Sequence, residues 1–185
     1  MSEPFLIVGL PRSRTAWWSI ATTTPQSVCR HEPLKDCNSF EELAALWTDP
    51  KIDYVGVSDS GLVPVLERVL EEIKPRTIII ERPAAEALRS FENYFSGHAY
   101  DHDKVRVYFE TSARMLRSFH AHSLVKVVGY ADLSNPDVVS GAYQWLMPKN
   151  EWPFRFDMMH LNVQVDPAYV AREAVKPHSH WYRQP

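Results

Sequence analysis

Residues 5–19 read FLIVGLPRSRTAWWS, and this stretch indicates the class of fold. The apolar run at residues 5–8 ends at Gly9 and Pro11, as is typical of a short strand buried inside a sheet. A helix is predicted over residues 14–24. Two arginines, the hydroxyl side chains of Ser13 and Thr15, and two tryptophans therefore gather where a buried strand passes into a helix.

Along the rest of the chain, predicted strands and helices alternate. We predict strands over residues 5–9, 27–30, 53–57, 76–80 and 124–130, and helices over residues 14–24, 39–47, 61–73, 83–95, 103–121 and 135–146. Several of these strands are apolar throughout, which is typical of a parallel sheet with helices on both faces. The predicted fold is a single-domain, three-layer α/β fold with a central, mainly parallel sheet flanked by helices.

Length and composition exclude several classes of protein. The 185 residues fit one domain (1–185), in which residues 148–185 are predicted to be partly irregular and to pack on or near the functional site. A formal net charge of −3 gives no reason to expect nucleic-acid binding. No apolar run reaches the roughly 18 residues of a membrane helix. Cys29 and Cys37 are too few for a disulfide framework, so we expect a cytoplasmic protein.

The loop after the first strand is the first candidate for a site, because ligands of parallel sheets bind at the carboxyl ends of the strands. Arg12 and Arg14 supply positive charge, and Ser13 and Thr15 supply hydroxyl donors. The start of the following helix adds backbone N–H groups and a partial positive charge. These groups predict a cradle for a phosphate or sulfate. The alternative is that both arginines are solvated loop residues and that the tryptophans are core residues.

This loop differs from the P-loop of the nucleoside triphosphatases, GxxxxGK[ST]. Counting from Gly9, Arg14 stands where the second Gly belongs, and Thr15 replaces the Lys. Ala16 replaces the hydroxyl residue that holds Mg²⁺. The loop is thus predicted to hold an anion without a metal ion. The His residues are scattered and no Cys spacing supports them, so we expect no metal site.

Three segments together resemble the sulfotransferase family. GLPRSRTAWW, which starts at residue 9, resembles the family's 5′-phosphosulfate loop. IIIERPAAEALRS places Arg82 at the end of a strand and Ser90 eight residues later, which is the family's spacing for two residues that bind the donor's 3′-phosphate. VKVVGYADLSNPDVV resembles the family's strand that ends in Tyr-x-Asp-Leu before a helix. Order and spacing agree over about residues 5–147, and the chain resembles a short bacterial- or phage-like member.

The resemblance implies a P-loop-type fold and the donor 3′-phosphoadenosine-5′-phosphosulfate. The residues implied at the donor are Arg12, Ser13, Arg14, Thr15, Ala16, Trp17, Arg82 and Ser90. By the resemblance, Arg12 stabilises charge on the leaving 5′-phosphate, Trp17 stacks on adenine, and Arg82 binds the 3′-phosphate. Two positions depart from the family pattern, because Arg14 replaces a Gly and Ala16 lacks a hydroxyl. If a positive φ is needed at residue 14, Arg14 carries a conformational cost there.

Two side chains are candidates for the base that takes the proton of the acceptor. Glu32 and His31 follow the second predicted strand and therefore face the same crevice as the loop. Glu32 lies twenty residues after Arg12, close to the position of the base in the tyrosylprotein branch of the family, whereas the cytosolic branch uses a His. The alternative for Glu32 is an Arg-paired structural carboxylate. Asp59, after the third strand, is near enough to line the acceptor pocket, but a helix N-cap explains it just as well.

The leading hypothesis is a sulfotransferase that moves a sulfuryl group to a hydroxyl of a small molecule, carbohydrate or peptide by in-line displacement. A catalytically silent nucleotide-binding or assembly module with the same fold is the alternative, since Arg14 and Ala16 depart from the family pattern. A nucleotide kinase-like P-loop enzyme is a further alternative. The chain is short for the family, which implies a small or open acceptor site, or one completed by a second subunit in a homodimer.

Overall fold

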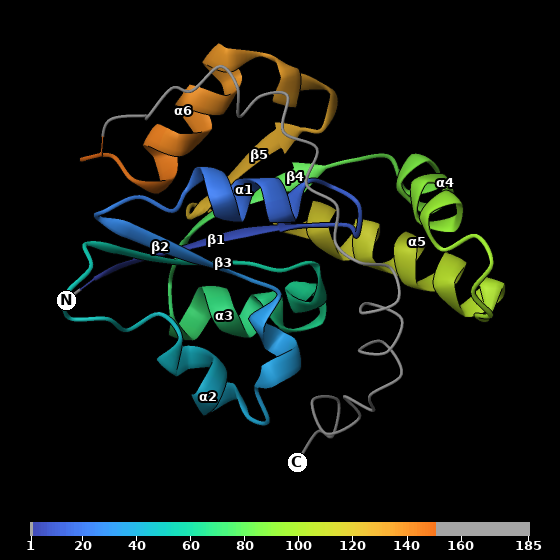
Figure 1. Cartoon of the computed structure of the whole chain (residues 1–185), viewed down its shortest axis with the longest axis horizontal. Helices are drawn as coiled ribbons and strands as arrows, with labels where there is room; N and C mark the ends of the chain where they lie inside the picture. The colour runs from blue at the N-terminus through green and yellow to red at the C-terminus, as the bar shows by residue number, and fades with distance from the viewer. Residues whose placement is uncertain (1, 151–185) are drawn as a thin grey trace.

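A five-stranded parallel sheet forms the centre of the structure, a computed structural model that describes residues 2–150 (Figure 1). In chain order the strands are β1 (Glu3–Gly9), β2 (Ser27–His31), β3 (Tyr54–Ser58), β4 (Arg76–Glu81) and β5 (Val125–Gly129). Their order in the sheet is β2-β3-β1-β4-β5, and every neighbouring pair is parallel. The predicted α/β class with a mainly parallel central sheet is confirmed.

Helices cover both faces of the sheet and give the predicted three layers (Figure 1). The described helices are α1 (Thr15–Ala21), α2 (Phe40–Ala45), α3 (Leu66–Glu72), α4 (Ala84–Tyr94), α5 (His102–Ser118) and α6 (Pro136–Leu146), with 3₁₀ segments η1 (Pro33–Asp36), η2 (Ser60–Val65) and η3 (Ala131–Ser134). One face packs against α1 and α6, and the other against α2, α3 and α5. The helix predicted over residues 61–73 is divided into η2 and α3, because Pro64 lacks the N–H that an α-helical turn requires.

The central strand β1 is buried on both faces, and its side chains alternate between two hydrophobic clusters. Leu6 and Val8 pack with residues of α2, α3 and α5, whereas Phe5 and Ile7 pack with residues of α1 and α6. All four side chains are fully buried. Because both faces of the strand are apolar, its sequence is a continuous apolar run without the alternation of a half-exposed strand. Beyond residue 5, polar side chains can therefore begin only where β1 ends.

The loops after β1 and β4 are neighbours at the carboxyl edge of the sheet. β1 pairs with β3 on one side and with β4 on the other, where Gly9 stands opposite Ile80. The chain runs from β1 to β2, returns to β3, and then crosses β1 to reach β4. The strand order therefore reverses at β1, and ligands of open α/β sheets bind at such a switch point.

The structure describes the chain only up to residue 150. Most of the segment predicted to be irregular and to pack near the site, residues 148–185, therefore lies outside the described residues. Among residues 2–150, no helix has the length and the apolar character that crossing a membrane requires.

Gly56 of β3 lies under the ring of Phe5 on the neighbouring strand, its partner in the pairing register. A Cβ atom at Gly56 would come within 2.1 Å of the ring, and the full burial of Phe5 leaves the ring no room to move. We expect Gly56→Ala to lower the free energy of unfolding by about 3 kcal/mol, as overpacking of a buried core does. Urea unfolding measures this change.

Gly141→Ala is the matched control for that variant. Gly141 lies within α6, and a Cβ atom there meets only Lys126 Nζ, at 3.8 Å. Ala is more favourable than Gly in a helix interior by roughly 0.5–1 kcal/mol, so this variant should be as stable as the wild type or more stable. An equal loss of stability in the two variants would contradict the packing of Phe5 against Gly56.

Candidate anion-binding site

The loop after β1 turns sharply and holds two arginines in a left-handed backbone conformation. Arg12 has φ 69° and Arg14 has φ 62°, backbone angles that residues other than Gly rarely adopt. Gly9 begins the turn, and a Cβ atom there would lie only 3.0 Å from the Ile80 carbonyl oxygen. Residue 14 therefore has a positive φ, and Arg14 carries there the conformational cost that a Gly would avoid. Arg14 is exposed, so its side chain points away from the core.

Arg82 follows β4 and ties four segments together. Its Nη1 donates a hydrogen bond to the Arg12 carbonyl oxygen, and its Nη2 donates to Glu86 Oε1 at 3.1 Å. The guanidinium carbon lies 3.9 Å from the centre of the Tyr130 ring, which follows β5. Only 8% of the Arg82 side chain is exposed. A single guanidinium group therefore joins the β1 loop, the end of β4, helix α4 and the end of β5.

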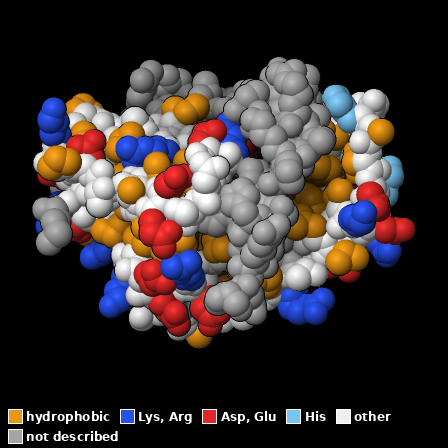
Figure 2. Space-filling model, turned by 90° about the horizontal axis from the view of Figure 1, so that it is seen from below, with side chains coloured by type: hydrophobic (Ala, Val, Ile, Leu, Met, Phe, Trp, Pro, Cys, Tyr) orange, Lys and Arg blue, Asp and Glu red, His pale blue; other side chains and the backbone are white. Residues whose placement is uncertain are grey.

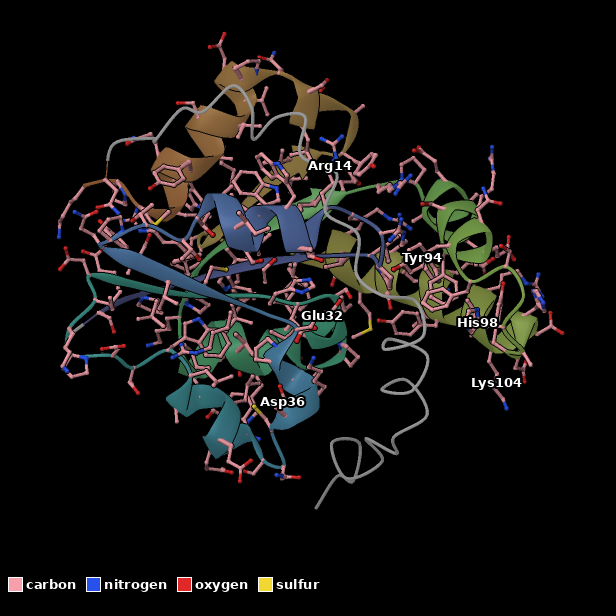
Figure 3. The ribbon with its side chains drawn as sticks, viewed as in Figure 1. Arg14, Glu32, Asp36, Tyr94, His98 and Lys104 are labelled. Atoms are coloured by element: carbon pink, nitrogen blue, oxygen red, sulfur yellow. The ribbon has the colours of Figure 1, made fainter. Side chains whose placement is uncertain are left out.

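The guanidinium groups of the loop, on Arg12 and Arg14, each lie near a tyrosine ring. The Arg12 guanidinium carbon lies 4.0 Å from the centre of the Tyr94 ring, and that of Arg14 lies 5.7 Å from the centre of the Tyr130 ring. Figure 3 shows Arg14 at the start of α1 and Tyr94 on α4, both at the carboxyl edge of the sheet. Cation–π contacts of this kind orient an arginine without neutralising its charge.

An open cleft of about 420 Å³ lies between the loop and α4. Its lining residues are Arg12, Arg82, Glu86, Arg89, Ser90, Asn93 and Tyr94. Three arginines and one carboxylate make this lining net positive, although the chain as a whole has a net charge of −3. On the face of the molecule in Figure 2, by contrast, acidic and basic side chains are interspersed. The cleft is thus a local concentration of positive charge and the candidate site for an anion.

The structure brings Arg12, Arg82 and Ser90 to this one cleft, although they come from different parts of the sequence. The two hydroxyl residues of the loop, Ser13 and Thr15, are buried. Ser13 is fully buried, and its hydroxyl has no hydrogen-bond partner among the described residues. Thr15 is 6% exposed, and its carbonyl accepts from Ser58 Oγ at 2.8 Å. The charge of the site therefore comes from arginine side chains.

Helix α1 is shorter than the predicted helix over residues 14–24 and contributes less to the site than expected. It spans seven residues, so its dipole adds little. Ala16 is half-buried on it and, as expected, offers no hydroxyl. Trp17 is only 4% exposed and packs in the cluster beneath α1, as Trp18 does. The stacking of Trp17 on adenine is not supported, because burial leaves no open ring face.

His31 is the last residue of β2, Glu32 follows it, and neither of them lines the arginine cleft. Their side chains approach each other, with His31 Nε2 at 3.7 Å from Glu32 Oε1. Glu32 has φ 47° and directly precedes η1 (Figure 3), and its N–H donates to the Ser58 carbonyl at 3.0 Å. Burial lowers the pKa of His31, more than the neighbouring Glu32 carboxylate raises it. Burial therefore favours the neutral form of the His31 imidazole over the charged form.

Asp59 follows β3 and has the structural role that the sequence left open. It is 3% exposed, and its two oxygens accept hydrogen bonds from the Leu34 N–H at 3.0 Å and the Gly61 N–H at 2.7 Å. Asp59 thus caps η2 and fastens η1 to it. Burial raises the pKa of Asp59 to about 7 against these two hydrogen bonds, and the charge of Glu32 also raises it.

The sequence contains no signal that marks Tyr94 or Tyr130 as site residues, and it favours a solvent-facing Arg89 over a functional one. Tyr130 lies inside the segment VKVVGYADLSNPDVV, where the pattern marked a strand end without giving the ring a partner. Arg89 directly precedes Ser90 and lies three residues after Glu86, so helical spacing could have placed it on the same face of α4. Tyr94 lies four residues after Ser90 and follows the same spacing.

Comparison with known proteins adds no assignment to this geometry. No protein-family model matches the chain, and no curated protein matches it significantly. Within residues 2–150, no group of three or more His, Cys, Asp or Glu side chains is placed to hold a metal ion. Function is therefore inferred from the arginine cleft and its surroundings.

Replacing Arg14 tests the strained loop. Gly adopts the left-handed conformation without steric cost, so Arg14→Gly should raise the free energy of unfolding by up to about 1 kcal/mol. A β-branched side chain is disfavoured there, so Arg14→Val should lower it by about 1–2 kcal/mol. Urea unfolding of both variants measures the difference. Equal stabilities for the Gly and Val variants would show that residue 14 is not held at positive φ.

The pKa of Asp59 predicts how stability depends on pH. Between its ordinary pKa of 3.8 and about 7, the folded chain keeps a proton at Asp59 that the unfolded chain releases. The contribution of Asp59 to the free energy of unfolding therefore falls as pH rises through this range. Asp59→Asn removes this titration, so the wild type should lose stability relative to the variant between about pH 4 and about pH 7.

Urea unfolding of both proteins at a series of pH values provides the measurement. His31 has a lowered pKa and acts in the opposite direction, since its charging weakens the fold as pH falls. Because His31 is present in both proteins, its effect cancels in the difference. A difference that is independent of pH would mean that Asp59 is already ionised at about pH 4 in the folded protein.

Proposed function

We propose that this chain is a sulfotransferase that transfers a sulfuryl group from 3′-phosphoadenosine-5′-phosphosulfate to a hydroxyl acceptor. The observation that carries the proposal is the convergence of Arg12, Arg82 and Ser90 on one cleft. The resemblance to sulfotransferases assigns these three residues to the two phosphate ends of a single donor. In the chain they lie in two segments about seventy positions apart, and they meet because β1 and β4 are neighbours.

The cleft suits a nucleotide that carries phosphate at both ends. Its volume of about 420 Å³ lies within the usual range for small-molecule sites. Its net positive lining favours a multiply charged anion, and guanidinium groups bind phosphate oxygens through paired hydrogen bonds. Without the P-loop Lys and the hydroxyl residue that holds Mg²⁺, the loop is poorly suited to a Mg²⁺–nucleoside triphosphate.

In the proposed reaction the acceptor oxygen attacks the sulfur, and the bond from sulfur to the bridging oxygen of the 5′-phosphate breaks. Arg12 would neutralise the charge that develops on this phosphate. His31 or Glu32 would take the acceptor proton, and the product 3′,5′-adenosine bisphosphate would leave. The acceptor would be a small molecule, a carbohydrate or a peptide, bound in the cytoplasm by this chain or between two copies of it.

A catalytically silent nucleotide-binding module is the second candidate, and one observation favours it. His31 and Glu32 do not line the cleft that holds Arg12 and Arg82. A base can act only within hydrogen-bonding reach of the proton that it removes, directly or through one water. Donor binding without sulfated product, across a broad panel of hydroxyl acceptors, would select this second function.

Calorimetric titration with 3′,5′-adenosine bisphosphate tests the donor site, with AMP and Mg-ATP as comparison ligands. The wild type should bind the bisphosphate more tightly than AMP, because the cleft offers charge to both phosphates. Arg12→Ala and Arg82→Ala should each weaken binding of the bisphosphate by about 10- to 100-fold, the usual value of a charged hydrogen bond.

Arg106→Ala is the control, since Arg106 is exposed on α5, pairs with Asp103 at 3.0 Å and does not line the cleft. It should bind as the wild type does. Equal binding of AMP and the bisphosphate by the wild type, or no binding of either, would overturn the sulfotransferase proposal. Binding of Mg-ATP in preference to both would instead support a kinase-like enzyme.

A further inference from the structure

Arg82 has few groups left for a ligand. Two of its N–H groups are engaged by the Arg12 carbonyl and by Glu86, and its flat face is stacked on Tyr130. Its Nε is buried and has no hydrogen-bond partner among the described residues. With 8% of its side chain exposed, Arg82 holds the loop against α4 and β5 and presents little surface to the cleft.

Arg89 has the opposite character. It is exposed on α4, and it lines the cleft one turn of helix beyond Glu86. Glu86 forms its ion pair with Arg82, and among residues 2–150 no carboxylate lies within 4.0 Å of the Arg89 guanidinium. Arg12 is likewise without a carboxylate partner in this part of the chain. The unpaired positive charge of the cleft therefore lies at its two sides, on the loop and on α4.

The neighbours of Arg89 add uncharged donors on the same face of α4. Ser90 and Asn93 line the cleft beside it, and Asn93 is four residues further along the helix. A guanidinium flanked by a hydroxyl and a carboxamide offers several donors to the oxygens of one phosphate. The opposite face of α4 carries Ala87, Leu88 and other apolar residues that pack in the core, so the helix holds this row of donors in place.

We propose that Arg89 binds the second phosphate of the nucleotide and makes the cleft specific for a nucleoside bisphosphate, whereas Arg82 is a positioning residue. This inference rests on the proposed function, which supplies the nucleotide. Arg12 contacts the 5′-phosphate from the loop, and Arg89 with Ser90 contacts the 3′-phosphate from α4. Arg82 acts on both indirectly, because it fixes the Arg12 backbone and neutralises Glu86, the one carboxylate of the cleft.

The test compares 3′,5′-adenosine bisphosphate with AMP by calorimetry for the wild type, Arg89→Ala, Arg89→Lys, Arg82→Lys and the control Arg106→Ala. Arg89→Ala should weaken binding of the bisphosphate by about 10- to 100-fold and leave AMP binding within about twofold. Arg89→Lys should restore most of the preference, since it returns the charge. Arg82→Lys should weaken both ligands, because an ammonium cannot hold two acceptors and stack on Tyr130 at once.

The outcomes separate this inference from the proposed function. If the wild type prefers the bisphosphate and Arg89→Ala keeps the same preference, the role of Arg89 is overturned and the donor site stands. If Arg82→Lys loses only the preference and keeps AMP binding, Arg82 is the phosphate ligand and the assignment of roles is overturned. If the wild type shows no preference, both proposals fail. Thermal unfolding shows whether each variant is folded, and exposed Arg89 should tolerate both substitutions.

Discussion

Burial of β1 on both faces is the constraint on which the rest of the structure depends. The side chains of residues 5–8 are divided between the two clusters that join the sheet to its helical layers, so this part of the strand has no room for a polar side chain. The first polar side chains after this buried run lie in the loop that follows Gly9. The same central place puts this loop beside the end of β4, at the point where the strand order reverses.

Arg82 links the segments that surround the candidate anion-binding cleft. The hydrogen bond from its guanidinium to the Arg12 carbonyl bridges 70 sequence positions, and Tyr130 closes the opposite side. The arginines at positive φ in the loop are compatible with a stable fold because the surrounding contacts define their backbone. Each such residue costs about 1–3 kcal/mol, which is a large part of the stability of a small domain. The chain thus tolerates local strain where charge is concentrated.

The carboxyl edge contains two separate chemical regions. The arginines gather on the β4 side, whereas His31, Glu32 and Asp59 gather at the ends of β2 and β3, on the other side of β1. Asp59 fixes the second region through hydrogen bonds to the backbone of η1 and η2. In the proposed reaction, a donor in the arginine cleft would have to extend across the end of β1 to bring its sulfuryl group near His31 or Glu32. This distance decides whether the proposed site could transfer the sulfuryl group or only bind the donor.

The sequence by itself determined the parallel α/β fold and the edge of the sheet that carries the site, because apolar strands and polar strand ends are local patterns. Arg12 stands out in the sequence because it follows a buried strand, whereas Arg82 and Ser90 are expected from the resemblance to sulfotransferases. The sequence could not determine which side chains near the cleft are exposed and able to contact a ligand. The buried Trp17, the engaged Arg82 and the exposed Arg89 follow from contacts between elements far apart in the chain. Such contacts depend on strand order and side-chain packing, and only the tertiary structure decides these.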